Sequence, residues 1–311
     1  MALGLCCQWI EPVTKRDGSV EWKNISGERA LRLGRWREGK YSREEVLALY
    51  EGNARALTRF LDHVARRGIR LFRLSSEIFP LWDHCGELAR ESPTVRRELL
   101  RAGDIARARG IRVTTHPGQF CVLSSERESV VLNAIGELEY HAWTFDAMGL
   151  PRSTHAAINI HGGKAGRERA LIDRIRDLSP GVRSRLTLEN DENCYSLREL
   201  LPVHEATGVP IVWDSHHHGF RTGDLSLAEA DRLSRETWSS TGAKPLQHLS
   251  NTEPGREGGS KSERRKHSWE IHWVPEPQLE GLMADEIDVD VEAKAKNLAI
   301  FKLVENMKIP L

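Results

Sequence analysis

Six short runs rich in β-branched and apolar residues each end on a histidine or a carboxylate. In chain order these residues are His116, His161, Glu189, Asp214, His248 and Glu292. A lone residue of this kind is more often a hydrogen-bonded structural group than a ligand. Six in succession, with no cysteine among them, form the mixture of imidazole and carboxylate groups that suits Zn²⁺ or Mn²⁺.

Burying these six residues together would be costly without a counter-charge, because the carboxylates and imidazoles would lose their hydration. Divalent cations remove that cost, and six or more ligands exceed one tetrahedral set, so we expect two or more ions. His217, three residues after Asp214, is a further candidate, as is His267, which follows a basic segment. The alternative is a solvated rim with chance histidines, which the regular placement of the six residues disfavours.

The six residues can meet only if the runs that carry them are parallel strands of one sheet. Eight candidate strands alternate with segments of helical spacing, which predicts an α/β protein with a single (β/α)8 TIM barrel over residues 1–311. All strand ends would then lie on the face where barrel enzymes keep their chemistry. A two-domain Rossmann-type protein is the alternative, but no strand is followed by GxGxxG or a P-loop. The candidate strands are 3–9, 70–76, 111–116, 156–162, 184–190, 209–215, 245–250 and 287–293, and the candidate helices are 43–68, 94–110, 128–149, 167–175, 195–208, 226–237 and 293–305.

The composition is that of an ordinary globular protein. Hydrophobic residues make up 39% and charged residues 29% of the 311 residues, and the formal net charge is zero, which argues neither for nor against nucleic acid as a partner. Five scattered cysteines without CxxC spacing indicate free thiols in a reducing compartment. No apolar run approaches the roughly 18 residues of a membrane helix. We therefore expect a cytoplasmic protein without a membrane partner.

Two kinds of segment could contact a nucleic acid near the metal-binding face. The stretch TTHPGQF, residues 114–120, ends a strand on a candidate ligand, turns at Pro-Gly and then exposes Gln119 and Phe120. Residues 29–40 and 256–267 cluster Lys and Arg with Gly. Such basic runs are usually only solvated, but beside a metal-binding face they could hold a phosphate backbone.

The order of these motifs resembles that of UV damage endonucleases. HPGQF, INIHGG, LENDE, DSHHH, QHLS with a distal RRKH, and VEAK carry the resemblance, together with the opening LGLCCQW and the segment LFRLSSEIFP, from about residue 3 to residue 305. The family is similar in fold to endonuclease IV and to xylose isomerase-like barrels. The resemblance implies a monomeric DNA repair enzyme that nicks duplex DNA immediately 5′ of UV photoproducts and leaves a 3′-hydroxyl and a 5′-phosphate.

The resemblance also implies roles for individual residues. It assigns one metal to His116, His161 and Glu189, a second to Glu189, Asp214, His248 and Glu292, and a third to His217 and His267, with Mn²⁺ as the usual ion and Zn²⁺ or Mg²⁺ as alternatives. The residues that it places against DNA are Gln8, Trp9, Gln119, Phe120, Arg264 and Arg265.

The chain departs from some members of the family at three positions. Leu246 stands where some members have a modified lysine, Leu5 where some have a tyrosine, and Glu77 where some have a histidine. These departures concern the third metal and the damage pocket. Two other functions would fit the motifs: a metal-dependent sugar isomerase, which needs a closed pocket and no basic loop, and a DNA-binding module with structural metals.

Overall fold

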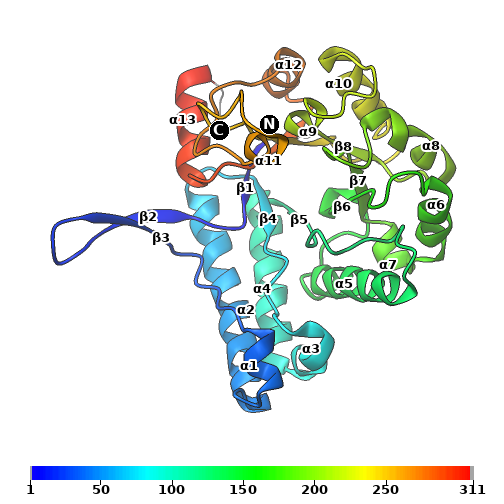
Figure 1. The fold of residues 1–311 in the computed structure, drawn as a ribbon. Coiled ribbons are helices and arrows are strands. Elements are labelled where there is room, and N and C mark those ends of the chain that lie inside the picture. The colour runs from blue at the N-terminus through cyan, green and yellow to red at the C-terminus, as the bar shows by residue number, and fades with distance from the viewer. Residues whose placement is uncertain (1, 309–311) are drawn as a thin grey trace.

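Eight parallel strands form a closed barrel in the computed structural model, which describes residues 2–308 (Figure 1). The strands follow one another around the barrel in the order β1-β10-β9-β8-β7-β6-β5-β4, so neighbours in sequence are neighbours in space. All eight predicted strands are confirmed, although most of the predicted runs extend beyond the strand that forms. The strands are β1 (Ala2–Cys6), β4 (Leu71–Leu74), β5 (Arg112–Thr115), β6 (Ile158–His161), β7 (Leu186–Glu189), β8 (Ile211–Asp214), β9 (Leu246–Leu249) and β10 (Asp288–Val291).

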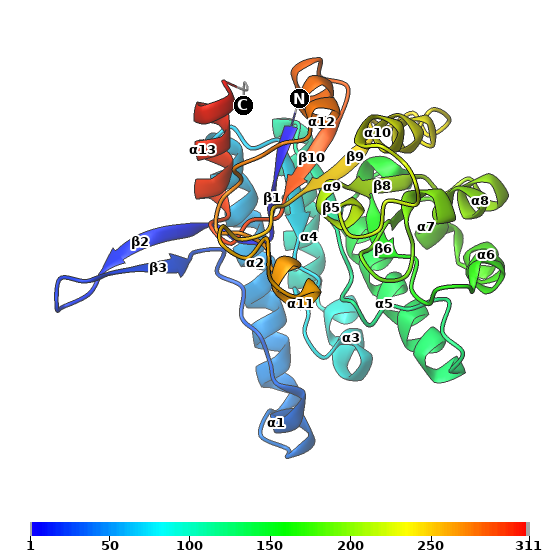
Figure 2. The same ribbon diagram turned by 45° about the horizontal axis from the view of Figure 1, so that its top comes forward.

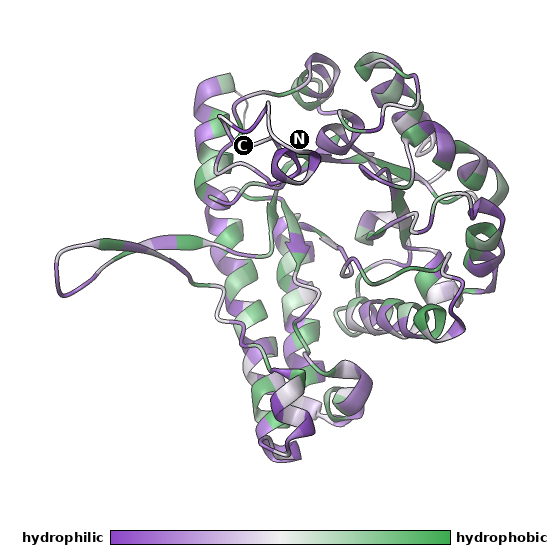
Figure 3. Cartoon of the chain, in the orientation of Figure 1, coloured by the Kyte–Doolittle hydropathy of each residue, from purple (hydrophilic) through white to green (hydrophobic). Residues whose placement is uncertain are grey.

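Helices surround the barrel and present hydrophobic residues to it, which gives them alternating hydrophilic and hydrophobic stretches in Figure 3. In residues 2–308, no helix combines the length and the apolar character that crossing a membrane requires. The α-helices are α1 (Leu33–Arg37), α2 (Arg43–Arg66), α3 (Trp82–Glu91), α4 (Pro93–Arg109), α5 (Glu128–Ala147), α6 (Glu168–Asp177), α7 (Pro180–Arg183), α8 (Leu197–Thr207), α9 (Ser215–His218), α10 (Leu227–Glu236), α11 (Lys261–Arg264), α12 (Glu276–Met283) and α13 (Asn297–Met307), and η1 (Thr154–Ala156) is a 3₁₀ turn.

Local sequence signals explain where the long helices begin and end. Ser42, Ser196 and Ser226 each accept a hydrogen bond from the amide of a glutamate three residues later, and that glutamate bonds back to the serine amide. Gly110 ends α4 in the left-handed conformation, which costs glycine little. These boundaries set where each chain segment enters the next strand.

An antiparallel hairpin between β1 and α2 was not predicted from the sequence. Its strands, β2 (Ile10–Thr14) and β3 (Val20–Asn24), form a separate sheet and extend away from the barrel in both ribbon views (Figures 1 and 2). Every residue of β3 is exposed, so no buried alternation marks it as a strand. The predicted surface loop 251–267 is largely irregular, but it contains the short helix α11 and a bridge between Thr252 and His267.

A buried ion pair fills the end of the barrel opposite the predicted ligands. The Arg112 guanidinium is buried, with Nη1 3.0 Å from Asp288 Oδ2. It also donates to the carbonyl oxygens of Lys244, Thr154 and His155. Because each nitrogen of the guanidinium has a partner, the group closes this end of the barrel without leaving an uncompensated charge.

We expect Gly103→Ala to destabilise the protein by about 1–3 kcal/mol, the usual cost of overpacking. A Cβ at this position in α4 would lie 1.7 Å from the Met148 carbonyl oxygen, so the helix would have to move away from that segment. Gly136→Ala in α5 is the matched control, because its Cβ meets open space; this change should stabilise by about 0.5–1 kcal/mol. Chemical denaturation of both variants measures the difference, and equal stabilities would contradict the packing.

Candidate metal centre

The register of the barrel strands places the predicted ligands side by side. His161 and Glu189 are Cα partners across β6 and β7, and Asp214 and His248 are partners across β8 and β9. His116 follows the last residue of β5, as Glu292 follows the last residue of β10. All six side chains therefore lie at the same end of the closed sheet, as the sequence predicts.

Glu189 is the centre of this group. Its carboxylate is 1% exposed, and its Oε2 lies 3.0 Å from His116 Nε2. Its Oε1 lies 3.2 Å from His248 Nδ1 and 3.3 Å from His217 Nδ1. With one oxygen facing His116 and the other facing His217 and His248, Glu189 can bridge two ions.

Three sets of side chains within residues 2–308 have ligand atoms within 4.8 Å of one another. They are His116 with His161 and Glu189, Glu189 with Asp214 and His217, and Asp214 with His248 and Glu292. Several of their atoms are buried without a hydrogen-bond partner: His161 Nδ1, Asp214 Oδ2 and His248 Nε2. These unpartnered nitrogen and oxygen atoms are of the kinds that coordinate Zn²⁺ and Mn²⁺, so the residues suit the ions that the sequence predicts.

The charges of the group are interdependent. Burial alone would raise the pKa of Glu189, but the fields of His248 and His161 hold it well below its usual range. Burial would lower the pKa of His248, whereas Glu189 and Glu292 together raise it to about 9. Despite burial, the pKa of His217 is also raised well above its usual value, with Asp214 the largest favourable influence, so the buried carboxylates of the cluster favour positive charge beside them, which a bound cation would supply.

The structure does not join His217 and His267 in one set of candidate ligands. His217 faces Glu189 and Asp214, whereas His267 Nδ1 lies 3.6 Å from Glu292 Oε2. The ring of His216 lies 5.9 Å from that of His267, centroid to centroid. The third site therefore remains a prediction without a preformed set of ligands in residues 2–308.

The predicted DNA contacts divide into exposed and buried residues. Phe120 is 79% exposed, and Gln119 and Gln8 are also exposed. The assignment of Trp9 is wrong: its indole is 1% exposed and packs edge-on against His63 and Phe301, at centroid distances of 4.8 Å and 5.6 Å. The chain turns at Cys7, whose φ is 65°, and this turn directs the indole into the core.

The basic loop is attached beside the predicted ligands through Glu192. Arg265 Nη1 lies 2.6 Å from Glu192 Oε1, and Lys261 Nζ donates to the Glu192 carbonyl oxygen at 2.6 Å. Glu192 Oε2 is 3.7 Å from His217 Nε2. The Arg264 guanidinium lies over the ring of Phe220 at 5.1 Å. Arg264 and Arg265 are thus near the predicted metal-binding face, although both already have partners within the protein.

One protein family matches the chain over most of its length. The family described as UV-endonuclease UvdE matches residues 18–310. The chain belongs to this family. The resemblance that the sequence motifs carry is thereby confirmed.

The similarity to individual relatives supports the assignment to the UvdE family. The chain is 38% identical to the UV DNA damage endonuclease of Deinococcus radiodurans over 314 residues, covering 97% of this chain and 94% of that one. The crystal structure of SacUVDE matches all of both chains with a TM-score of 0.79 and 26% identity. Endonuclease IV from Thermus thermophilus matches 81% of this chain and 94% of that one, with a TM-score of 0.56 and 15% identity, which shows a shared fold. The predicted barrel is confirmed.

Several neighbours of the predicted ligands in this UvdE-family chain were not predicted. Arg73, on β4, forms an ion pair with Glu292 through Nη1 and Oε1. Asn159 donates to Glu189 Oε2 at 2.5 Å, and Asp290 Oδ2 lies 3.8 Å from His248 Nε2. Asn159 and Asp290 each precede a ligand by two residues, so the alternation of a strand would have placed them on the same face. Such neighbours orient the ligands and set their basicity.

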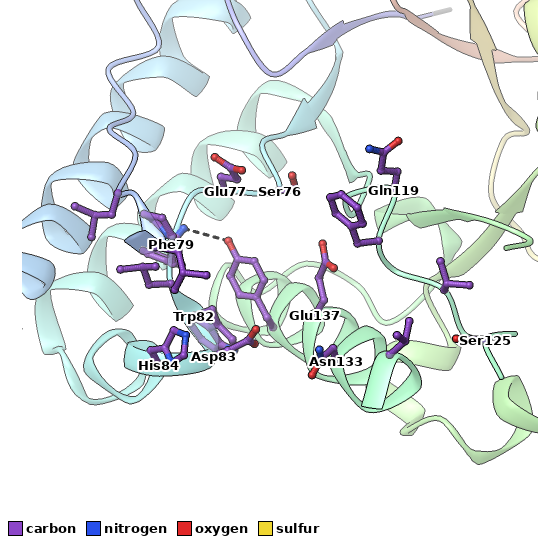
Figure 4. Close-up of a pocket in the computed structure, with 18 of the residues that line it drawn as sticks. Ser76, Glu77, Phe79, Trp82, Asp83, His84, Gln119, Ser125, Asn133 and Glu137 are labelled. Atoms are coloured by element: carbon purple, nitrogen blue, oxygen red, sulfur yellow. Dashed lines mark hydrogen bonds between the residues drawn. The ribbon is translucent and has the colours of Figure 1, made fainter. Parts of the chain in front are cut away.

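A cleft of about 600 Å³ lies beside the exposed Gln119–Phe120 pair (Figure 4). Phe79, Trp82 and Tyr140 form an aromatic cluster along it, with the Phe79 amide donating to the Tyr140 hydroxyl at 3.1 Å. Ser76, Glu77, Asp83 and Glu137 supply oxygen atoms to its lining, so Glu77 lies at this cleft and not among the ligand sets. The cleft combines flat apolar walls with hydrogen-bond acceptors.

Proposed function

We propose that this protein is a metal-dependent DNA repair endonuclease that hydrolyses the phosphodiester immediately 5′ of a UV photoproduct, leaving a 3′-hydroxyl and a 5′-phosphate. The observation that carries the proposal is the group of buried ligands around Glu189, which lies on the same face as the exposed Gln119–Phe120 turn. Membership in the UvdE family supports the same reaction. The partner is double-stranded DNA carrying UV lesions, and one chain supplies all the proposed ligands.

His116, His161 and Glu189 would hold one ion, and Glu189, Asp214, His248 and Glu292 a second. Divalent ions such as Mn²⁺ supply activation of water and neutralisation of the charge that develops on the leaving oxygen. The chain's own contribution is orientation: Asn159 fixes Oε2 of Glu189, and Arg73 holds Glu292. His217 faces Glu189 and Asp214 in the same group and completes its lining.

The selection of damaged DNA would depend on the turn after His116. A photoproduct weakens base stacking and pairing, so the energy needed to open the duplex is lowest at the lesion. An exposed phenyl ring and an amide can occupy the space that opens between the bases. Phe120 and Gln119 are exposed side chains of this kind, a few residues from a proposed metal ligand.

A nicking assay on irradiated and unirradiated plasmid, with Mn²⁺ and with chelator, tests the proposal. We expect nicks only in irradiated plasmid, only with the metal, and with termini that a DNA polymerase extends directly from the 3′ side. Binding of damaged DNA without nicking at any metal concentration would contradict the enzyme and favour a DNA-binding module. Turnover of a ketose or aldose without nicking would favour the sugar isomerase.

We expect the basic loop to bind the phosphate backbone. Replacing Lys261, Arg265 and Lys266 by alanine should weaken DNA binding and lower the slope of log affinity against log salt by roughly 0.9 for each phosphate that the loop no longer neutralises. Lys261 and Arg265 bond to Glu192 in the free protein, so their binding to DNA requires exchange of that partner. Binding measured from low to high salt determines the slope. An unchanged slope would mean that this loop faces away from DNA.

A further inference from the structure

The turn that joins the predicted ligand His116 to Phe120 has few contacts of its own. The Cys121 amide donates to the Gly118 carbonyl oxygen at 2.9 Å, which closes the turn. His116 Nδ1 lies 2.9 Å from the Pro117 carbonyl oxygen. Gly118 is exposed and has no side chain to anchor it. Pro117 and Cys121 are buried and fix the two ends of the turn, so an external contact is needed for residues 118–120, where glycine leaves the backbone free to move.

Glu137 supplies such a contact from helix α5. The Gly118 amide donates to Glu137 Oε1 at 2.9 Å, which links the turn to a helix 19 residues further along the chain. Ala134 and Leu138, on either side of Glu137 in α5, are buried in the core, so the helix offers a fixed support. In Figure 4 the Glu137 carboxylate extends from α5 toward the segment that carries Gln119.

The charge of Glu137 needs an explanation, because a carboxylate on a DNA-facing cleft opposes the approach of phosphates. Burial raises its pKa, and Asp83 raises it further, whereas the Gly118 amide favours the ionised form. An ordinary solvated carboxylate would be further from the backbone and more exposed. A partly buried carboxylate aimed at one backbone amide is typical of a group that orders a loop.

We propose that Glu137 is a positioning residue that fixes Gly118 and thereby sets where Gln119 and Phe120 lie relative to His116. This inference rests on the proposed function, because it gives the turn the task of probing damaged bases. With the hydrogen bond formed, the probing side chains are ordered before DNA binds, so less conformational entropy is lost on binding. Without it, the turn samples other conformations, and binding to damaged DNA weakens.

Three variants test this inference. Glu137→Ala removes the acceptor, Glu137→Gln keeps an oxygen at the same place, and Glu139→Ala is the matched control, a glutamate two residues further along the same helix. We expect Glu137→Ala to lower the preference for irradiated over intact duplex about tenfold, in line with the loss of one hydrogen bond to a charged group. Glu137→Gln should retain most of the preference, and Glu139→Ala should retain all of it. The metal content should be unchanged in all three.

Hydrogen exchange at the Gly118 amide gives a second readout that does not involve DNA. Exchange should accelerate about tenfold or more in Glu137→Ala and stay slow in Glu137→Gln. If exchange is unchanged, or if Glu137→Ala keeps its preference for damage, the positioning role is refuted while the proposed function stands. If the wild-type protein itself shows no preference for irradiated DNA, the proposed function fails and this inference fails with it.

Discussion

Replacement of Glu189 by glutamine is expected to reduce nicking at least about a hundredfold and to leave the barrel folded. The carboxylate lies 3.0–3.3 Å from His116, His217 and His248. Glutamine would replace one carboxylate oxygen by an amide nitrogen, which does not coordinate divalent cations. The apolar core does not depend on this charge, so circular dichroism should match the wild type. Metal content measured by atomic emission should fall together with activity.

The control for this prediction is Glu126→Gln, the same chemical change at a side chain that is 77% exposed and pairs with Arg167 at 3.4 Å. This variant should keep its metal and its activity. Near-normal turnover of Glu189→Gln with a full complement of metal would show that another carboxylate bridges the ions.

The strand ends could be predicted because two short-range rules act together. The apolar residues of a run such as INIH or LTLE indicate a buried strand. The carboxyl ends of parallel strands all lie at one end of the barrel, so a polar residue that ends such a run is placed there. The register in the barrel then brings His161 beside Glu189 without further information. The grouping of the candidate ligands could therefore be predicted from the sequence almost completely.

Residues whose position depends on the path of a loop could not be predicted. Trp9 lies just beyond β1, where the left-handed turn at Cys7 decides whether the ring faces solvent or core. The position of His267 depends on how loop 251–267 folds back. The ion pair between Arg265 and Glu192 and the backbone bridge between Thr252 and His267 determine that path. Such contacts join residues far apart in the sequence, so no local pattern encodes them.

The hairpin was not predicted because its residues carry almost no signal of burial. Its two strands pair only with each other, and Val20 and Trp22 are exposed, so neither burial nor periodicity separates them from a loop. The lysine and arginine residues of this segment are interspersed with acidic residues, as in the contact between Lys15 and Glu21 at 3.6 Å. Of the hairpin strands only Ile10 is buried in the core, and an argument from the hydrophobic pattern cannot detect elements that contribute so little to it.

Replacement of Phe120 by alanine is expected to lower the affinity for irradiated duplex about ten- to a hundredfold, with little change for intact duplex. Stacking of a ring on a base contributes about 1–3 kcal/mol, and that interaction forms only where the bases have opened. The alternative role for the ring is packing on the rim beside Cys121 and Val122. At 79% exposure the ring has little packing to lose, so the stability of the protein should hardly change.

Two further variants separate stacking from simple loss of apolar surface. Phe120→Tyr keeps the ring and should keep the preference for damage, whereas Leu132→Ala removes another exposed apolar side chain, 60% exposed on α5, and should have no effect. Binding to irradiated and intact duplex is measured by fluorescence anisotropy, with metal content determined in parallel. Because the ligands lie on the strand ends and not on the ring, the metal should be retained. A Phe120→Ala protein that still prefers damaged DNA, or that loses metal in proportion to activity, would show that the ring is structural and that recognition depends on another part of the face.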